Sequence, residues 1–154
     1  MRTCLPLLLL LGFATAGDKD DAKDKDDAKD KEQIQGLWQA VSLETSGQKA
    51  PVEVVKMFQV LIKDDKLVFN PDSEKRGHII ALNPKGKPKE LDLTPEDGPM
   101  KGKKMPCAIY KLDGDKLVIC LDKDGKAVKR PGEFKTEEGD GFALLTFERV
   151  KKGK

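Results

Sequence analysis

Ile34-Gln35-Gly36-Leu37-Trp38-Gln39-Ala40-Val41-Ser42-Leu43-Glu44 is the stretch that decides the fold. It contains the only tryptophan of the chain, and it follows directly on a run of charged residues. It is also the first segment that is apolar enough to join a packed core. We therefore expect a β-strand here, opened by Gly36, and a folded domain that begins at Ile34.

The residues at the start of the chain have the pattern of a targeting segment. Met1-Arg2 gives a short positive end, Leu5 to Phe13 is an apolar run, and Ala14-Thr15-Ala16 supplies the small residues that a signal peptidase reads. We predict a signal peptide over residues 1–16 and export to the periplasm or the extracellular space. The apolar run is shorter than the ~20 residues that cross a bilayer, so we expect no transmembrane span after cleavage.

Residues 17–33 are low in complexity. The hexapeptide Asp-Lys-Asp-Asp-Ala-Lys stands at Asp18–Lys23 and again at Asp24–Lys29. It carries no large apolar side chain, so the sequence predicts a disordered, charged linker. Aspartates are ligands for divalent cations, but the interleaved lysines repel such ions, and we expect no metal site.

Beyond Glu44, short apolar runs alternate with glycine, proline and charged turns, which is typical of an all-β domain. A short helix is expected near Val52–Met57. Strands are expected at Phe58–Ile62, Leu67–Phe69, Gly77–Leu82, Glu90–Leu93, Cys107–Leu112, Asp115–Leu121 and Phe142–Val150. With the opening strand this makes about eight, and a small antiparallel barrel over residues 34–151 leaves no exposed sheet edge. Residues 152–154 form a basic tail. The net charge of +2 is too small to indicate nucleic-acid binding.

Two motifs at the ends of the domain carry a family resemblance. Gly36-x-Trp38-x-x-Val41-Ser42 and Thr146-Phe147-Glu148-Arg149 resemble the termini of calycin barrels, the group of the lipocalins and fatty-acid-binding proteins. The resemblance implies that Arg149 lies over Trp38 in a cation–π contact. It makes Gly36, Trp38 and Arg149 structural residues, with the tryptophan a plug of the core.

Three further motifs, Asp92–Pro99, Tyr110–Asp115 and Arg130–Phe134, resemble an uncharacterised lipocalin-like domain family known mainly from planctomycete bacteria. That family has no established activity. Leu145 and Phe147 stand where fatty-acid-binding proteins carry an arginine and a tyrosine for the ligand's carboxylate, so that route of binding is not implied. We expect a monomer that binds a small apolar or amphipathic ligand. The alternative is a ligand-free module that docks on an envelope protein through its loops.

The mature chain keeps two cysteines, Cys107 and Cys120. If Asp113-Gly114 is a two-residue turn, the two cysteines face each other at a non-hydrogen-bonded pair, where a cross-strand disulfide fits. A longer turn with a bulge would separate the sulfurs and leave two buried thiols. Both alternatives remain open at the level of sequence.

No pattern predicts catalysis or a cofactor. His78 is the only histidine, and a lone histidine in an apolar strand indicates a packed residue. The pair Asp122-x-Asp124 lacks the glycine of a calcium loop. Six lysines of two loops form either a basic rim or ordinary solvated surface: Lys85, Lys87, Lys89, Lys101, Lys103 and Lys104.

Overall fold

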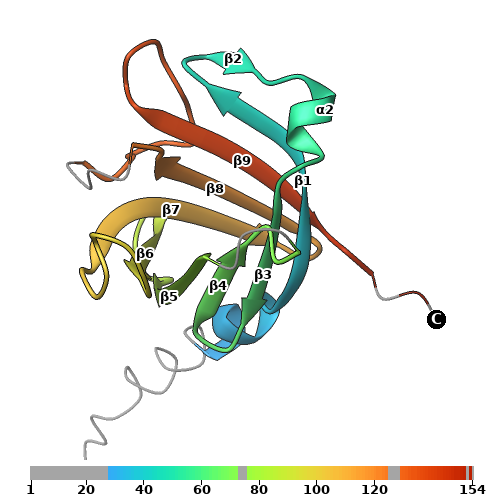
Figure 1. Cartoon of the computed structure of the whole chain (residues 1–154), viewed down its shortest axis with the longest axis vertical. Coiled ribbons are helices and arrows are strands. Elements are labelled where there is room, and N and C mark those ends of the chain that lie inside the picture. Colours follow the sequence, from blue (N-terminus) through green and yellow to red (C-terminus); the bar gives the residue numbers. More distant parts are fainter. Residues whose placement is uncertain (1–27, 73–75, 125–128, 152, 154) are drawn as a thin grey trace, which may run out of the picture.

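The computed structural model describes residues 28–72, 76–124, 129–151 and 153. These residues form a closed antiparallel barrel of eight strands (Figure 1). Each barrel strand pairs with the next, and the last pairs with the first. The all-β barrel predicted from the sequence is confirmed. Its strands are β1 (Gly36–Thr45), β3 (Gln59–Lys63), β4 (Lys66–Phe69), β5 (Arg76–Asn83), β6 (Lys89–Pro95), β7 (Met105–Asp113), β8 (Lys116–Asp122) and β9 (Phe142–Arg149).

Two small elements connect β1 to β3. The two-residue strand β2 (Gln48–Lys49) folds back on the end of β1, in a segment that composition alone indicates as a loop. The helix α2 (Val52–Val55) follows Pro51, which suits the start of a helix because proline has no N–H to donate. This is the predicted short helix.

The two ends of the barrel differ. We call the end where β1 begins and β9 finishes the closed end, near Gly36 and Arg149. We call the opposite end the mouth, near Thr45 and Phe142. In Figure 1 the helical turn that precedes β1 lies by the closed end, below β3 and β4.

The packed unit begins earlier than Ile34. Residues 28–33, expected to belong to the disordered linker, are helical, and Asp30 within them is 6% exposed. Asp30 and Ile34 are four residues apart, which places them on one face of a helix, toward the barrel. The predicted signal peptide, residues 17–27 of the predicted linker, and Lys152 and Lys154 of the tail lie outside the described residues.

The β7–β8 hairpin turns one residue later than expected. Asp113 pairs with Lys116, so the loop is Gly114-Asp115 rather than Asp113-Gly114. Gly114 has φ +57°, whereas Asp115 is not among the residues with positive φ. Glycine at the first central position is the requirement of a type II′ turn, while Asp-Gly was expected to form type I′. The shift changes every cross-strand pair of this hairpin.

Candidate functional site

At the closed end, Arg149 and Trp38 form the contact that the family resemblance implied. The guanidinium carbon of Arg149 lies 4.1 Å from the centre of the Trp38 ring. Nη2 of the same group donates to the carbonyl of Gln33 at 2.6 Å, Nη1 donates to the carbonyl of Gln35, and Nε donates to Asp115 Oδ1 at 3.0 Å. The predicted cation–π pair is therefore also a clamp on the chain that leads into β1.

Arg149 and Trp38 donate hydrogen bonds to carbonyl groups at the end of a helix. The last carbonyls of a helix have no partner within it and need donors from outside. Besides the two that Arg149 binds, the carbonyl of Ile34 accepts from Trp38 Nε1 at 2.9 Å. Gly36 fits this arrangement because its φ is +126°, and a Cβ there would lie 3.0 Å from Arg149 Nη1. Gly36, Trp38 and Arg149 thus close the barrel.

A buried acid completes the closed end. Asp30 Oδ2 accepts hydrogen bonds from Tyr110 Oη at 2.6 Å and from Lys89 Nζ at 2.7 Å. Tyr110 is 1% exposed and Asp30 6% exposed, so both partners lie inside the protein. Sequence reasoning missed this group, because Asp30 reads as one aspartate among many in the repeat. The only signal was its spacing of four residues from Ile34.

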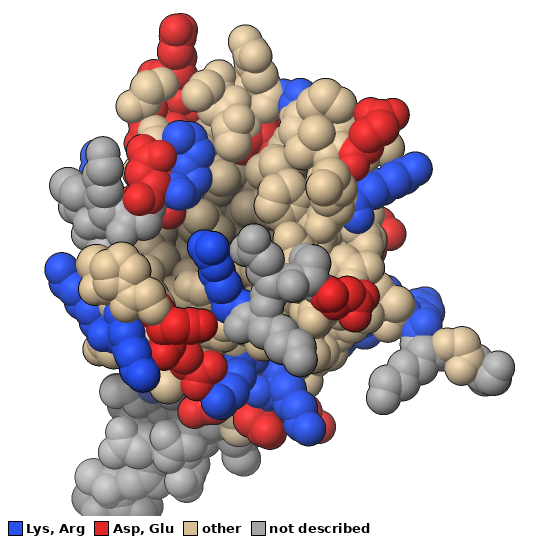
Figure 2. Space-filling model, viewed as in Figure 1, with Lys and Arg blue, Asp and Glu red and all other residues tan. Residues whose placement is uncertain are grey.

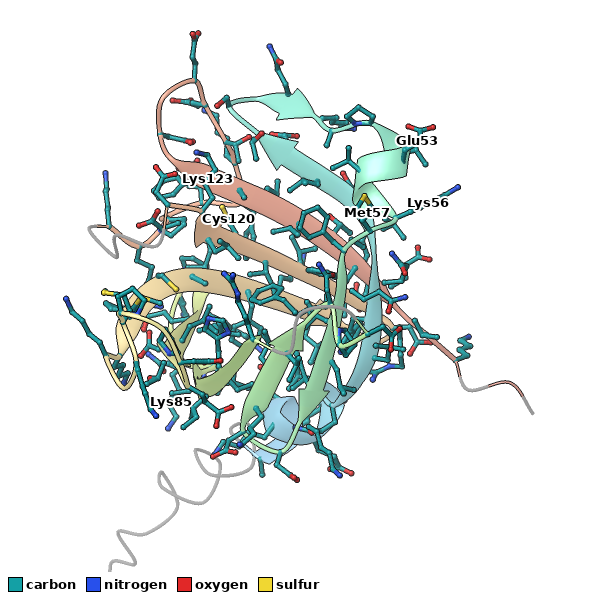
Figure 3. All side chains as sticks on the ribbon, viewed as in Figure 1. Glu53, Lys56, Met57, Lys85, Cys120 and Lys123 are labelled. Atoms are coloured by element: carbon teal, nitrogen blue, oxygen red, sulfur yellow. The ribbon has the colours of Figure 1, made fainter. Side chains whose placement is uncertain are left out.

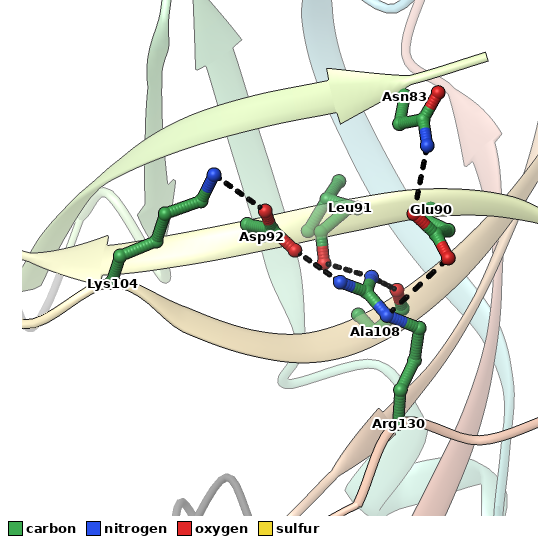
Figure 4. A network of polar contacts seen from close by, with 7 residues as sticks. All are labelled: Asn83, Glu90, Leu91, Asp92, Lys104, Ala108 and Arg130. Carbon is green, nitrogen blue, oxygen red and sulfur yellow. Dashed lines mark hydrogen bonds and ion pairs between the residues drawn. The ribbon is translucent and has the colours of Figure 1, made fainter. Parts of the chain in front are cut away.

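A second polar network lies where β6 and β7 are irregularly paired. The register shifts between Leu91 and Leu93, so the regular ladder is interrupted there. Arg130 fills the interruption by donating to the carbonyls of Leu91 and Ala108, at 3.4 and 2.6 Å (Figure 4). The same guanidinium pairs with Asp92 at 2.5 Å, and Lys104 pairs with the other oxygen of that carboxylate at 2.9 Å.

The charges around Asp92 decide its ionisation. Burial alone would raise the pKa of Asp92, but the hydrogen bonds and charges of Arg130 and Lys104 outweigh it and hold the pKa below the ordinary value. The carboxylate is therefore an ionised structural partner. Arg130 belongs to one of the motifs of the family resemblance, and its contacts explain why an arginine stands there.

The closed half of the barrel interior is filled. A void large enough for water would expose the side chains that line it, yet the largest core side chains are less than 2% exposed. A ligand has no room among them. These side chains include Trp38, Val60, Ile62, Leu67, Leu91, Tyr110, Leu117 and Phe147.

The interior opens toward the mouth. Five apolar residues there are only partly buried against the core: Leu43, Phe58, Phe69, Met100 and Leu121. Met100 also lines a cleft of about 480 Å³ between the mouth ends of β5, β6 and β7, the loop that follows β6 and the segment that follows β8. We call it the mouth cleft. Its lining combines apolar and charged groups, with Asp124 coming from the segment after β8: Arg76, Gly77, His78, Pro95, Asp97, Gly98, Pro99, Met100, Met105 and Asp124.

His78 is the unusual residue of the mouth cleft. It lies opposite Leu67 on one side and Pro95 on the other, which directs its ring toward the barrel interior. The ring meets Phe69 edge-on, with centroids 5.8 Å apart. Burial, the largest influence, lowers the pKa of His78 below its ordinary value. Its Nδ1 is buried and finds no hydrogen-bond partner in the part of the chain that the structure describes.

The six lysines of the two loops do not form one rim. The β5–β6 turn, with Lys85 and Lys87, lies at the closed end, whereas the β6–β7 loop, with Lys101 and Lys103, lies at the mouth. Lys89 and Lys104 are engaged by Asp30 and Asp92. On the face shown in Figure 2, basic and acidic side chains are intermixed, and the hollow near its centre is bordered mainly by uncharged residues.

Of the two alternatives for the cysteines, the Cys107–Cys120 disulfide is not formed and the pair of buried thiols is observed. Both Cys107 and Cys120 are free and buried. Because the hairpin turn is shifted, Cys120 lies opposite Ile109 rather than Cys107. Cys107 packs in the interior core, while Cys120, on β8 in Figure 3, donates to the carbonyl of Lys135 at 3.8 Å. Burial raises the pKa of each thiol to about 11, so neither is a nucleophile at neutral pH.

Two features are absent from the described residues. No helix in the described ranges is both long and apolar enough to cross a membrane. Among the same residues, no three histidine, cysteine, aspartate or glutamate side chains stand close enough to hold a metal ion.

Comparison with known proteins adds no family. No protein-family model matches this chain, and neither a curated protein nor a solved structure matches it. The geometry by itself supports a fold assignment: the chain is an eight-stranded, all-antiparallel closed barrel, consistent with a calycin-like fold.

Proposed function

We propose that this chain is an exported lipocalin-like barrel that binds a small amphipathic molecule in the mouth cleft. The observation that carries the proposal is the contrast between the two halves of the interior. The closed half is filled by fully buried side chains, whereas the mouth keeps partly exposed apolar residues beside a cleft of about 480 Å³. That volume is within the range of small-molecule sites.

The lining of the cleft suits a ligand with an apolar body and a polar end. Met100, Met105 and Pro95 offer apolar surface, and methionine side chains adapt to irregular shapes. His78 Nδ1 has no hydrogen-bond partner among the described residues, and an unsatisfied buried polar atom is costly. A ligand group that donates to or accepts from this ring would remove that cost.

The proposal is one of binding rather than catalysis. Its support is chemical: the chain has a single histidine, and both thiols of the folded domain are held protonated at neutral pH. Export is part of the proposal and rests on the signal-like pattern of residues 1–16. The family motifs and the Arg149–Trp38 contact support the lipocalin-like part of it.

A fluorescent amphipathic probe tests the site. Anilinonaphthalene sulfonate is titrated into the folded protein and into two methionine-to-tryptophan variants. Met100→Trp places a larger side chain in the mouth cleft, and we expect it to weaken probe binding at least tenfold. Met57→Trp is the matched control, because Met57 is 72% exposed and lies outside the cleft. Equal binding by all three proteins would refute the mouth cleft as the site.

One observation favours the second candidate, a docking module. Val52, Val54 and Met57 expose 60%, 40% and 72% of their surface on and just after α2. Figure 3 shows Met57 next to this helix. Neighbouring exposed apolar residues mark interaction surfaces in many soluble proteins. For a docking module, Met57→Glu abolishes binding to an envelope partner and Met100→Trp leaves it intact. The ligand proposal predicts the opposite sensitivity for small-molecule binding.

A further inference from the structure

A larger cleft lies at the closed end of the barrel, away from the mouth. Its volume is about 710 Å³. One wall is the helical turn before β1, a second is the β3–β4 turn, and the third is the closed-end half of β5. We call it the lateral cleft. None of its lining residues belongs to the mouth cleft.

The walls of the lateral cleft are fixed to one another. Gln35 bridges two of them: its side-chain amide donates to the carbonyls of Lys31 and Asp64, at 2.8 and 2.9 Å. The amide oxygen of Gln35 accepts from the backbone N–H of Asp64 at 2.6 Å. Arg149 and Trp38 hold the same helical turn from the barrel side. The cleft is therefore preformed, which lowers the entropic cost of binding.

The third wall is a strand edge without a partner. β4 pairs with β5 only at Arg76–Ile79, and the last rung is the bond from the Ile80 N–H to the carbonyl of Asp65, at 2.7 Å. β5 continues to Asn83, however, and pairs there with β6 alone among the described strands. Backbone groups two residues apart point to the same side of a strand. The N–H and C=O of Leu82 therefore face the lateral cleft beyond the end of β4.

The side chains around this edge determine which kind of ligand the cleft would bind. The apolar lining residues are Ile34, Ile80, Ala81 and Leu82, of which Ile34 and Ile80 are almost fully buried and Leu82 is partly exposed. The charged lining residues are three acids, Glu32, Asp64 and Asp65, and one base, Lys31. The rim therefore has an excess of negative charge and favours a positively charged partner.

We propose that the lateral cleft binds a short, extended, basic peptide, which pairs its main chain with Leu82 of β5. Addition of a strand to an open sheet edge is a general mode of peptide recognition. Main-chain hydrogen bonds to Leu82 would set the direction of the peptide. An apolar side chain would contact Ile80 and Leu82, and flanking lysines or arginines would meet the acidic rim.

The first experiment uses the unchanged protein and synthetic peptides. Binding of acetyl-Lys-Leu-Val-Leu-Lys-amide is followed by backbone NMR shifts and by calorimetry. A set of analogues carries one N-methyl group at each amide in turn. Because strand pairing uses every second N–H, we expect the methyl group that faces Leu82 to weaken binding at least tenfold. The methyl groups on the two neighbouring residues should change it less than threefold.

The second experiment tests charge in the protein. Glu32→Lys combined with Asp65→Lys should weaken binding of the same peptide at least tenfold. Glu138→Lys is the control, since Glu138 is exposed and lies outside the cleft. A peptide with glutamate in place of both lysines should bind at least tenfold more weakly to the unchanged protein.

Several results would overturn the proposal. One is the absence of peptide binding at millimolar concentration. Another is equal binding by all the N-methylated analogues, which would exclude main-chain pairing without any change to the protein. A third is a set of NMR shifts centred on the mouth cleft instead of Ala81–Asn83. Since the two clefts share no residue, failure here leaves the proposed function untouched.

Discussion

Arg149 illustrates how one side chain joins several parts of the structure. It stacks on Trp38, holds two carbonyls at the end of the helical turn, and pairs with Asp115 in the β7–β8 turn. Of these contacts the family resemblance predicted only the first. The others depend on the helical turn and on the shifted hairpin, which the sequence pattern did not indicate.

Replacement of Arg149 by methionine keeps the length of the side chain and removes its charge and hydrogen bonds. We expect the free energy of unfolding to fall by about 2–4 kcal/mol, the sum of a cation–π contact and charge-assisted hydrogen bonds. Chemical denaturation measures it. Lys151→Met is the control, because the Lys151 side chain is 81% exposed, and its effect should stay within ~0.5 kcal/mol. Equal effects of the two substitutions would contradict the clamp.

His78 makes the free energy of unfolding depend on pH. Burial lowers its pKa in the folded state below the ordinary 6.5, so on acidification the unfolded state binds a proton first. The stabilising contribution is complete well above pH 6.5 and is lost as the pH falls through 6.5 toward the folded pKa.

The difference in unfolding free energy between the natural protein and His78→Gln isolates this contribution. As the pH is lowered from about 8 to 5, we expect the natural protein to lose more unfolding free energy than His78→Gln does. Only the slope matters, so a constant offset caused by the substitution does not affect the test. A difference that is independent of pH would show that His78 is not buried as described.

At the scale of elements, the strands could be predicted, but the exact positions of the turns between them could not. Short apolar runs between turn residues predicted the strands β3 to β9, and Pro51 before Val52–Met57 predicted the short helix α2. The β7–β8 turn was misplaced by one residue, because both Asp113-Gly114 and Gly114-Asp115 are acceptable turn pairs and differ only in turn type. This shift by one residue changes the register of the hairpin, so Cys107 and Cys120 do not lie opposite each other.

The helical turn of residues 28–33 was missed for another reason. Its composition is that of the repeat before it, and apart from the four-residue spacing to Ile34 no local signal separates Asp30 from a solvated aspartate. What distinguishes Asp30 is tertiary: Tyr110 and Lys89, distant in sequence, supply its hydrogen bonds. Both clefts were also beyond prediction, because each is lined by residues from several separate elements.

Asp30→Ala tests whether this turn is part of the folded domain. It leaves the Tyr110 hydroxyl and the Lys89 ammonium without their carboxylate, so we expect a loss of about 2–3 kcal/mol in unfolding free energy. Glu32→Ala, an exposed acid of the same turn, should cost less than ~0.5 kcal/mol. Thermal and denaturant unfolding compare them. If the two variants were equally stable, residues 28–33 would not contribute to the packed unit.

At the scale of the whole molecule, the two ends of the barrel differ in how tightly they are packed. The closed end is held by the Arg149 clamp and the buried Asp30, and the adjoining core excludes any ligand. The mouth keeps partly exposed apolar side chains and the His78 Nδ1 atom, which has no hydrogen-bond partner in the described part of the chain. Rigidity at one end and access at the other suit a protein that carries a small molecule.

Native mass spectrometry of the protein purified from its own host tests this central claim most directly. We expect the natural protein and Met57→Trp to carry a non-covalent adduct of a few hundred daltons that is released on denaturation. Met100→Trp, which fills the mouth cleft, should be recovered without it. An adduct of equal occupancy on Met100→Trp, or a bare natural protein that also fails to bind the amphipathic probe, would contradict a ligand site at the mouth.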